Sequence, residues 1–338
     1  MEKQIITVFG GAGFIGRHLV HRLVKAGATV RVACRDTEAA LFMKPMGDVG
    51  QVVLVKADIK SDESVANAVN GAQTVVNLVG LLAESGKQSF ENVHAAGAER
   101  IAKAAKAAGA RNMIQISAIG ANAGSESLYA RTKAAGEKAV KAAFKGAVII
   151  RPSIVFGPED GFFNLFSSIA RLSPVLPVFG CPAFPKISLF SEKGLAHIDL
   201  YGDGGTKFQP VYVGDVADAI VACIDNDEAR GGTFELGGPT VYSSVELMQL
   251  LLKTIDRKRW LLPIPFWVLM IEGWFLGLLP KPLLTVDQVK LLKTDNVVGK
   301  RSKKLSSLGI QPTAAEAVLP TYLARFRLPN HGAVSTTT

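Results

Sequence analysis

The sequence predicts an α/β fold built on a doubly wound parallel sheet, with a smaller C-terminal α/β domain. Two observations carry this prediction. Up to about residue 150, short β-branched runs alternate with alanine-rich helical runs, which is typical of strand–helix–strand crossover units. Most of the strand-like runs are continuously apolar, as expected for parallel strands that helices cover on both faces. With 338 residues, 48% of them apolar, the chain is also long enough for two domains.

The expected elements follow one another in order. Strands are expected at Gln4–Phe9, Thr29–Cys34, Val52–Val55, Thr74–Leu78, Asn112–Ser117 and Ala147–Arg151. Between them we expect helices at Phe14–Lys25, Thr37–Lys44, Asp62–Asn70, Glu91–Ala108 and Leu128–Phe144. Strand–helix alternation at this spacing implies right-handed crossovers, and therefore parallel neighbours in the sheet.

The alternation weakens after Pro152. Residues 157–209 are rich in Gly, Pro and Phe and are expected to form loops with short helices. Beyond them the pattern predicts strands at Val211–Val213 and Thr233–Glu235 and helices at Asp215–Ile224 and Ser244–Thr254. We therefore predict a nucleotide-binding domain over residues 1–155, a C-terminal substrate or partner-docking region over 156–328, and a flexible polar tail over 329–338.

A glycine-rich turn follows the first expected strand and opens the first expected helix. In a Rossmann fold, such glycines make the tight turn, let a pyrophosphate approach the backbone, and let helix and strand pack closely. The helix N-terminus then faces the phosphates. In this context the pattern predicts an NAD(P) site formed by Gly10, Gly11, Gly13, Phe14, Ile15, Gly16 and Arg17.

The end of the second expected strand bears on the choice of nucleotide. An NAD site usually places a carboxylate there to bind the ribose hydroxyls, whereas an arginine suits the 2′-phosphate of NADP(H). Arg35 stands at this point, so NADP(H) is favoured, although Asp36 beside it keeps NAD(H) open. The pair Asp58 and Ile59 after the third strand, and Gly80 after the fourth, are expected to line the adenosine end.

Tyr129 and Lys133 are spaced four residues apart on an expected helix, which puts both side chains on one face. Ser117 ends the preceding strand. A lysine ammonium lowers the pKa of a nearby phenol, and a serine hydroxyl can hold a carbonyl oxygen against it. The trio Ser117, Tyr129 and Lys133 is therefore the predicted catalytic group, and a solvated Tyr–Lys pair without function is the plain alternative.

Basic residues concentrate late in the chain. The net charge is +9, and residues 253–304 hold 11 Lys/Arg against 4 Asp/Glu. This concentration favours an acidic partner or an anionic membrane surface, with a solvated charged rim as the plain alternative. The segment carries no recognised nucleic-acid-binding motif, so no nucleic-acid partner is expected.

The same segment contains an apolar block. Its longest charge-free run, Trp260–Ile271, is too short to span a bilayer, so no transmembrane helix is expected. A helix is expected over Phe266–Leu279, with one apolar face made of Trp267, Met270, Ile271, Trp274, Phe275 and Leu278. Such a face suits a membrane interface or a groove on a hydrophobic partner, and ordinary core of the second domain is the alternative.

No disulfide, metal site or targeting segment is expected. Cys34, Cys181 and Cys223 lie far apart and form no paired motif. His18 and His21 share a helix face but lack an evident third ligand. The chain runs from its N-terminus straight into an apolar strand, which leaves no room for a signal or transit peptide.

Together these residues resemble the extended and atypical short-chain dehydrogenase/reductase superfamily over residues 4–240. The matching motifs are Gly10-x-x-Gly13-x-x-Gly16, Ser117, Tyr129-x-x-x-Lys133, Arg151-Pro152-x-x-Val155-Phe156-Gly157-Pro158 and Gln209-Pro210-Val211-x-Val213-x-Asp215. The resemblance implies a Rossmann fold and adds Pro152 and Val155 to the expected cofactor contacts.

A narrower resemblance points to one branch. Gly13-Phe14-Ile15-Gly16-Arg17, Tyr129-x-Arg131-x-Lys133-Ala134-x-Gly136-Glu137 and Leu262-Pro263-Ile264-Pro265-Phe266 are similar to the nucleotide-binding accessory subunits of respiratory complex I and their bacterial relatives. This resemblance implies a tightly held and mainly structural NADPH, and docking on peripheral-arm subunits of the complex near the membrane. In a bacterial member it implies a peripheral position on the cytoplasmic side of the inner membrane.

Departures from the superfamily pattern leave a second interpretation open. Asn77-Leu78-Val79-Gly80 replaces the usual Asn-Asn-Ala-Gly, and Cys181–Leu200 looks like an insertion where substrate loops usually lie. The Ser117–Tyr129–Lys133 trio is nevertheless intact. The alternative is an NAD(P)H-dependent reductase, dehydrogenase or epimerase of a small carbonyl or sugar-nucleotide substrate, and a nucleotide sensor is a third interpretation.

Overall fold

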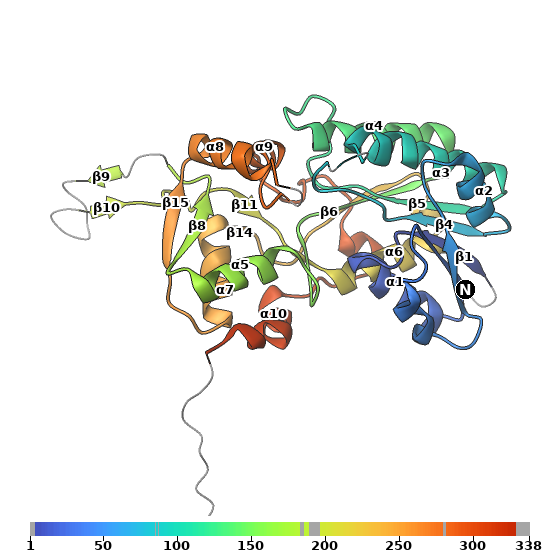
Figure 1. Ribbon diagram of the computed structural model, residues 1–338, viewed down its shortest axis with the longest axis horizontal. Coiled ribbons are helices and arrows are strands. Elements are labelled where there is room, and N and C mark those ends of the chain that lie inside the picture. The colour runs from blue at the N-terminus through green and yellow to red at the C-terminus, as the bar shows by residue number, and fades with distance from the viewer. Residues whose placement is uncertain are drawn as a thin grey trace, which may run out of the picture.

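The computed structural model describes residues 4–84, 86, 88–182, 186–188, 197–279 and 282–328. Its centre is a seven-stranded parallel sheet in the order β13-β6-β5-β4-β1-β2-β3 (Figure 1). The strands are β1 (Ile5–Phe9), β2 (Thr29–Cys34), β3 (Val52–Lys56), β4 (Thr74–Asn77), β5 (Asn112–Ile116), β6 (Val148–Pro152) and β13 (Thr233–Leu236). The strand order reverses between β1 and β4, so the carboxyl ends of these two strands open a crevice for a ligand.

Helices cover both faces of this sheet, as predicted. On one face lie α1 (Phe14–Lys25) and α6 (Val213–Ile224), and on the other lie α2 (Asp62–Val69), α3 (Ala98–Ala107) and α4 (Leu128–Ala143) (Figure 1). Each layer has its own core, and most of the inward side chains are aliphatic and fully buried. The doubly wound parallel fold is therefore confirmed, and each of the six predicted strands is present to within one residue at either end.

The prediction of an α-helix at Thr37–Lys44 is wrong. The chain instead forms a short 3₁₀ helix, η1 (Leu41–Met46), which contains Pro45. Asp36 Oδ1 accepts a hydrogen bond from Ala39 N at 3.0 Å, so a side-chain-bonded turn occupies the start of the expected helix. This turn and the proline leave too few residues for an α-helix.

The helix expected at Glu91–Ala108 is divided. Its first part, η2 (Glu91–Gly97), is a π-helix, and α3 continues from Ala98. The wide turn brings η2 close to α4, because a Cβ at Gly136 would lie 1.9 Å from the carbonyl oxygen of His94. Single π-turns of this kind are found frequently at functional sites.

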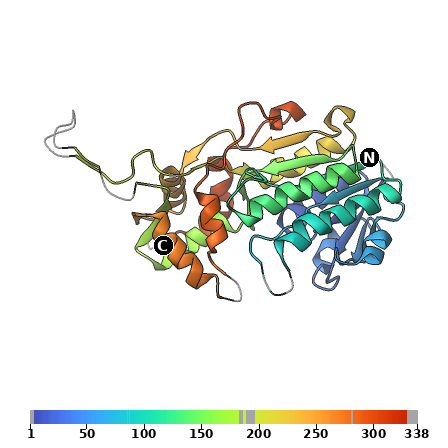
Figure 2. The same cartoon turned by 90° about the horizontal axis from the view of Figure 1, so that it is seen from above.

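The C-terminal part packs around a second core. Its helices are α5 (Phe162–Leu172), α7 (Ser244–Thr254), α8 (Phe266–Leu276), α9 (Val286–Leu292) and α10 (Ala315–Leu323), with the 3₁₀ turn η5 (Ala324–Phe326). Its short strands pair as β7 (Val155–Phe156) with β12 (Val211–Tyr212), β8 (Val175–Phe179) with β15 (Trp260–Ile264), and β11 (Lys207–Phe208) with β14 (Tyr242–Ser243). Within 157–209, where loops with short helices were expected, the described residues form α5 and also the strands β8 and β11, and Figure 2 shows α5 beside the carboxyl ends of the large sheet.

Several elements beyond residue 155 belong to the large sheet or to the helical layer that contains α1. β13 pairs with β6 at one edge of the sheet, and α6 packs into the same core as α1, as do the 3₁₀ turns η3 (Asp227–Ala229) and η4 (Leu305–Leu308). Residues after 155 therefore contribute to both parts of the molecule, and the division at residue 155 stays a prediction. The tail 329–338 lies outside the described residues, and of the insertion Cys181–Leu200 the structure describes 181–182, 186–188 and 197–200, which include the antiparallel pair β9 (Lys186–Ser188) and β10 (His197–Asp199).

The apolar block gives a strand and a helix. Trp260–Ile264 is β15, and α8 ends at Leu276 rather than at the expected Leu279. Most of the expected face is open to solvent: Trp267 is 64% exposed and Trp274 59%, and Ile271, Phe275 and Leu278 are exposed as well. We call these five side chains the α8 face. Met270 is the exception, because it packs on the second core.

These exposures exclude ordinary core as the explanation for the α8 face. Within the part of the chain that the structure describes, no helix is long and apolar enough to cross a membrane.

The basic residues of 253–304 do not gather in one place. Arg257 Nε donates to the carbonyl of Phe326, Lys293 lies 4.0 Å from Glu126, and Lys303 packs over the ring of Phe234. These partners belong to three different regions of the fold. The charge that is continuous in the sequence is therefore divided in space.

Candidate nucleotide and catalytic site

The turn between β1 and α1 has the geometry of a phosphate loop. Gly10 has φ +76°, which favours glycine, and a Cβ at Gly16 would lie 2.4 Å from the carbonyl oxygens of Gly10 and Gly11. Gly13 is the N-cap of α1, and no side chain caps this helix. The first amide groups of α1 therefore remain available to an anion, as the sequence predicts.

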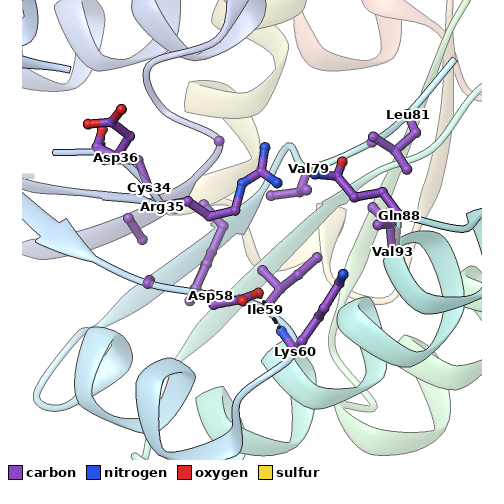
Figure 3. A pocket seen from close by; sticks show the side chains of 15 residues that line it. Cys34, Arg35, Asp36, Asp58, Ile59, Lys60, Val79, Leu81, Gln88 and Val93 are labelled. Carbon is purple, nitrogen blue, oxygen red and sulfur yellow. Dashed lines mark hydrogen bonds between the residues drawn. The ribbon is translucent and has the colours of Figure 1, made fainter. Parts of the chain in front are cut away.

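A cavity of about 300 Å³ lies at the carboxyl ends of β1, β2, β3 and β4 (Figure 3). Of the predicted cofactor residues it is lined by Gly10, Arg35, Asp58, Ile59 and Gly80. It is also lined by residues that the sequence did not single out as cofactor contacts, among them Cys34, Lys60, Val79, Leu81, Gln88 and Val93. A dinucleotide fits this arrangement, because the cavity adjoins the phosphate loop at Gly10.

Two cations line this cavity. In Figure 3 Arg35 extends into it from the end of β2, and Lys60 extends into it from the turn after β3. Asp58 Oδ1 accepts from Lys60 N at 3.0 Å and so fixes that turn. The carboxylate of Asp36 points away from Arg35. It accepts the hydrogen bond from Ala39 N that forms the turn before η1.

Tyr129 and Lys133 lie one turn apart at the start of α4. Lys133 Nζ is 5.7 Å from the centre of the Tyr129 ring, and it lies against the backbone of Gly80 at the end of β4. Burial raises the pKa of the Tyr129 hydroxyl to about 12. The sequence suggested that the lysine would lower this pKa, but in this structure desolvation outweighs the ammonium. The phenol therefore keeps its proton at neutral pH.

The Lys133 ammonium is itself destabilised. Burial lowers its pKa to about 8, although the carboxylate of Glu137 opposes this shift. Glu137 in turn receives two hydrogen bonds from Arg151 on β6, at 2.8 and 2.7 Å. Lys133 is thus a cation whose charge is easily removed above neutral pH.

Ser117 lies just beyond the end of β5. Ser117 is 5% exposed, and its hydroxyl has no hydrogen-bond partner among the described residues. A buried hydroxyl without a partner costs free energy, so an orphan at the end of a strand fits a site that a ligand oxygen completes.

His94 ties the turn after β4 to α4. Its Nε2 accepts from Leu81 N at 3.0 Å, so Nδ1 carries the proton and donates to Thr132 Oγ1 at 3.1 Å. Burial, with the charge of Lys133, lowers the pKa of His94 to about 3, which keeps the ring neutral. The Tyr129 ring rests edge-on against His94 and Phe90. His94 therefore holds Tyr129 and the cavity wall in one rigid unit.

The remaining predicted cofactor residues of the turn, α1 and β6–β7 do not line the cavity. Arg17 forms an ion pair with Glu159 at 3.4 Å and its guanidinium packs on Phe42. Gly11, Gly13, Phe14 and Ile15 form the turn and the first residues of α1. Pro152 ends β6 and Val155 begins β7, and neither lines the cavity.

Three residues at this site, Lys60, His94 and Gln88, were not identified as site residues from the sequence alone. Lys60 could have been found by following the Asp58-Ile59 turn for one more residue. His94 and Gln88 gave no signal, because a histidine inside an alanine-rich helix and a glutamine in a loop are both common. As for metal, His18 bonds Glu159, and the described residues contain no group of three potential ligands.

Comparison with known proteins gives the following matches. The model of the NAD dependent epimerase/dehydratase family matches residues 6–237. NADH dehydrogenase [ubiquinone] 1 alpha subcomplex subunit 9 of Arabidopsis thaliana is 35% identical over 97% of this chain and 80% of its own length. The same subunit of Mus musculus is 33% identical over 96% and 80%.

A further relative carries an enzyme's name. Ceramide reductase of Caulobacter vibrioides is 37% identical over 52% of this chain and 54% of its own length. Among solved structures, UDP-glucose 4-epimerase of Thermotoga maritima superposes with a TM-score of 0.66 over 96% of this chain and 98% of its own, at 16% identity. That likeness supports the fold.

Proposed function

The chain belongs to the NAD dependent epimerase/dehydratase family, in the branch of the complex I alpha subcomplex subunit 9 proteins, and we propose that it is an accessory subunit of a bacterial NADH:quinone oxidoreductase that holds NADPH mainly as a structural ligand. One observation carries this proposal. The similarity to the Arabidopsis thaliana subunit covers 97% of this chain, so it extends beyond the nucleotide site to the part that carries the α8 face and the basic segment.

Arg35 and Lys60 support NADP(H) rather than NAD(H). Two cations directed into one cavity suit the two negative charges of a 2′-phosphate. The carboxylate that would favour an NAD ribose, Asp36, is instead bonded to Ala39 N. The argument for NAD(H) that the sequence left open is thereby weakened.

The α8 face supports a peripheral position at the membrane. Exposed aromatic and aliphatic side chains on one side of a short helix suit the interfacial region of a bilayer or an apolar groove of a neighbouring subunit. In the proposed assembly the partners are peripheral-arm subunits of the complex and the anionic surface on the cytoplasmic side of the inner membrane.

The proposal is tested by following chain and nucleotide together. Native membranes are solubilised in mild detergent, complexes are separated by size, and the nucleotide released from the fraction that contains this chain is identified. Co-migration with complex I and stoichiometric NADPH that survives washing are expected. A chain that is free of complex I and exchanges its nucleotide readily would overturn the proposal.

The intact trio favours a second candidate function, a reductase. Tyr129 holds its proton at neutral pH and could donate it to a carbonyl oxygen, Ser117 has an unpaired hydroxyl to orient that oxygen, and Lys133 would bind the ribose. NADPH would supply the hydride. The similarity to a ceramide reductase supports the same direction of reaction. Oxidation of NADPH by candidate carbonyl compounds, abolished in Tyr129→Phe, would establish this function.

A further inference from the structure

The N-terminus of α4 is capped by two side chains that are far apart in the sequence. Ser127 Oγ accepts the amide of Ala130 at 3.3 Å. Asp287 accepts the amide of Leu128 at 2.6 Å and that of Tyr129 at 3.0 Å. It also accepts the hydroxyl of Ser127 at 2.8 Å. The first three amides of the helix that carries Tyr129 and Lys133 thus depend on this pair.

Asp287 belongs to the hairpin of α8 and α9, which touches the nucleotide domain at two further points. Gln288 Nε2 donates to the carbonyl of Leu82 at 3.2 Å, and Lys293 lies 4.0 Å from Glu126. Figure 1 shows α9 next to the start of α4. The hairpin therefore contacts both the start of α4 and the turn after β4.

The two helices of the hairpin are closely packed. A Cβ at Gly273 on α8 would lie 3.0 Å from the backbone of Thr285 and Val286, so α8 and α9 meet backbone to backbone. Thr285 and Gln288 form a capping box that fixes the first turn of α9, where Asp287 sits. A displacement of α8 would therefore be transmitted to Asp287.

From these contacts we propose that Asp287 is a positioning residue for the nicotinamide end of the nucleotide. It holds the start of α4, and with it Tyr129 and Lys133, against the α8–α9 hairpin. A carboxylate at a helix N-terminus is also favoured by the helix dipole, so the contact is stable while the hairpin is in place. The inference rests on the NADP(H) binding proposed above.

The position of Asp287 predicts a selective effect. Arg35 and Lys60, which would hold the 2′-phosphate, line the cavity, whose lining includes neither Asp287 nor Tyr129. Loss of the carboxylate should therefore weaken the binding of NADPH, whose nicotinamide half would lie at Tyr129 and Lys133 in the proposed site. It should not weaken the binding of adenosine 2′,5′-bisphosphate, which lacks the nicotinamide half. A general loss of structure would weaken both ligands.

The test compares dissociation constants of the full chain for these two ligands. For Asp287→Asn we expect NADPH to bind roughly 5- to 20-fold more weakly and adenosine 2′,5′-bisphosphate to change less than about 2-fold. Asp295→Asn is the matched control, because Asp295 lies in the same segment but accepts the amide of Lys207 instead. It should leave both affinities unchanged. If Asp287→Asn fails to fold, Ser127→Ala removes another link of the same cap and should show the same selectivity.

Hydrogen exchange gives a second readout in the opposite direction. Because binding linkage is reciprocal, NADPH should slow amide exchange in α8 and α9 of the wild-type chain and have no such effect in Asp287→Asn. Equal weakening of both ligands, or unchanged NADPH affinity in Asp287→Asn, would overturn the inference while leaving NADPH binding intact. Failure of the wild-type chain to bind NADPH would instead overturn the proposed function and this inference with it.

Discussion

Lys133 shows at the scale of a single residue how this site opposes stability. Burial lowers the pKa of its ammonium from an ordinary value of 10.5 to about 8. Between these values the unfolded chain binds more protons than the folded chain, so this residue makes the free energy of unfolding rise as the pH rises from 8 to 10.5. Below pH 8 the full cost of the buried charge remains.

Replacing this lysine should therefore stabilise the chain. For Lys133→Met at pH 7 and without nucleotide, we expect the free energy of unfolding to increase by about 1–3 kcal/mol, because each unit of pKa shift corresponds to roughly 1.4 kcal/mol. Urea denaturation at pH 7 and at pH 10 measures this, and the gain should shrink at the higher pH. A loss of stability at pH 7 would show that the ammonium is better compensated than its burial implies.

Arg35 carries the expected preference for the 2′-phosphate. Arg35→Ala should lower the affinity for NADPH about 10- to 100-fold and the affinity for NADH less than about 3-fold, because only NADPH loses a charge-assisted contact. Titration calorimetry measures both. Arg31→Ala is the control, since Arg31 lies on β2, four residues before Arg35, but donates to the carbonyl of Asn70. Equal losses for NADPH and NADH would contradict the assignment.

At the scale of elements, one ion-pair network joins α4, β6 and β13. Arg151 on β6 bonds both carboxylate oxygens of Glu137 on α4 and lies 3.3 Å from Glu235 on β13. Glu235 also accepts the amide of Gly299 and the hydroxyl of Ser302. The network thereby attaches the edge strand and a late loop to α4, the helix that carries Tyr129 and Lys133.

Breaking this network should be costly, because the side chain of Glu137 is only 9% exposed and would lose both hydrogen bonds from Arg151. We expect Arg151→Ala to lower the free energy of unfolding by about 2–4 kcal/mol in chemical denaturation. Lys103→Ala breaks an exposed pair with Glu99 on α3 and should change the free energy of unfolding by less than about 0.5 kcal/mol. Similar effects from both variants would mean that the buried carboxylate finds another partner.

The elements also show where a pattern read along the chain is sufficient. The continuous apolar runs of β1 to β6 predict buried parallel strands, and these strands are present, because neighbours in a parallel sheet all require the same composition. The π-turn of η2 gave no such signal. It results from the close approach of His94 to Gly136, two residues that are 42 positions apart.

At the scale of the whole molecule, the α8 face is the feature most directly linked to assembly. The double variant Trp267→Glu and Trp274→Glu should reduce recovery of the chain with membranes at least about 5-fold, since it places two charges in an apolar interface. NADPH affinity should be unchanged. Leu172→Glu, an exposed apolar side chain on α5, is the control for added charge. Retention on membranes despite both changes would assign the contact to another surface.

The sequence by itself determined the sheet, the phosphate loop and the Tyr129–Lys133 pair. Each of these depends on residues that are close together along the chain: alternation of strand and helix, glycines within one turn, and a spacing of four on one helix. The same local logic fails for Thr37–Lys44, where a side-chain turn and a proline prevent the helix.

Only the tertiary structure decided the remaining features. It directs Arg35 and Lys60 into one cavity, turns Asp36 away, and divides a continuous basic segment among three regions. It also joins Asp287 to the start of α4, across more than 150 residues of chain. The physical reason is the same in each case. Burial, direction and partnership of a side chain depend on what packs against it, and packing brings together residues whose separation in the sequence carries no pattern.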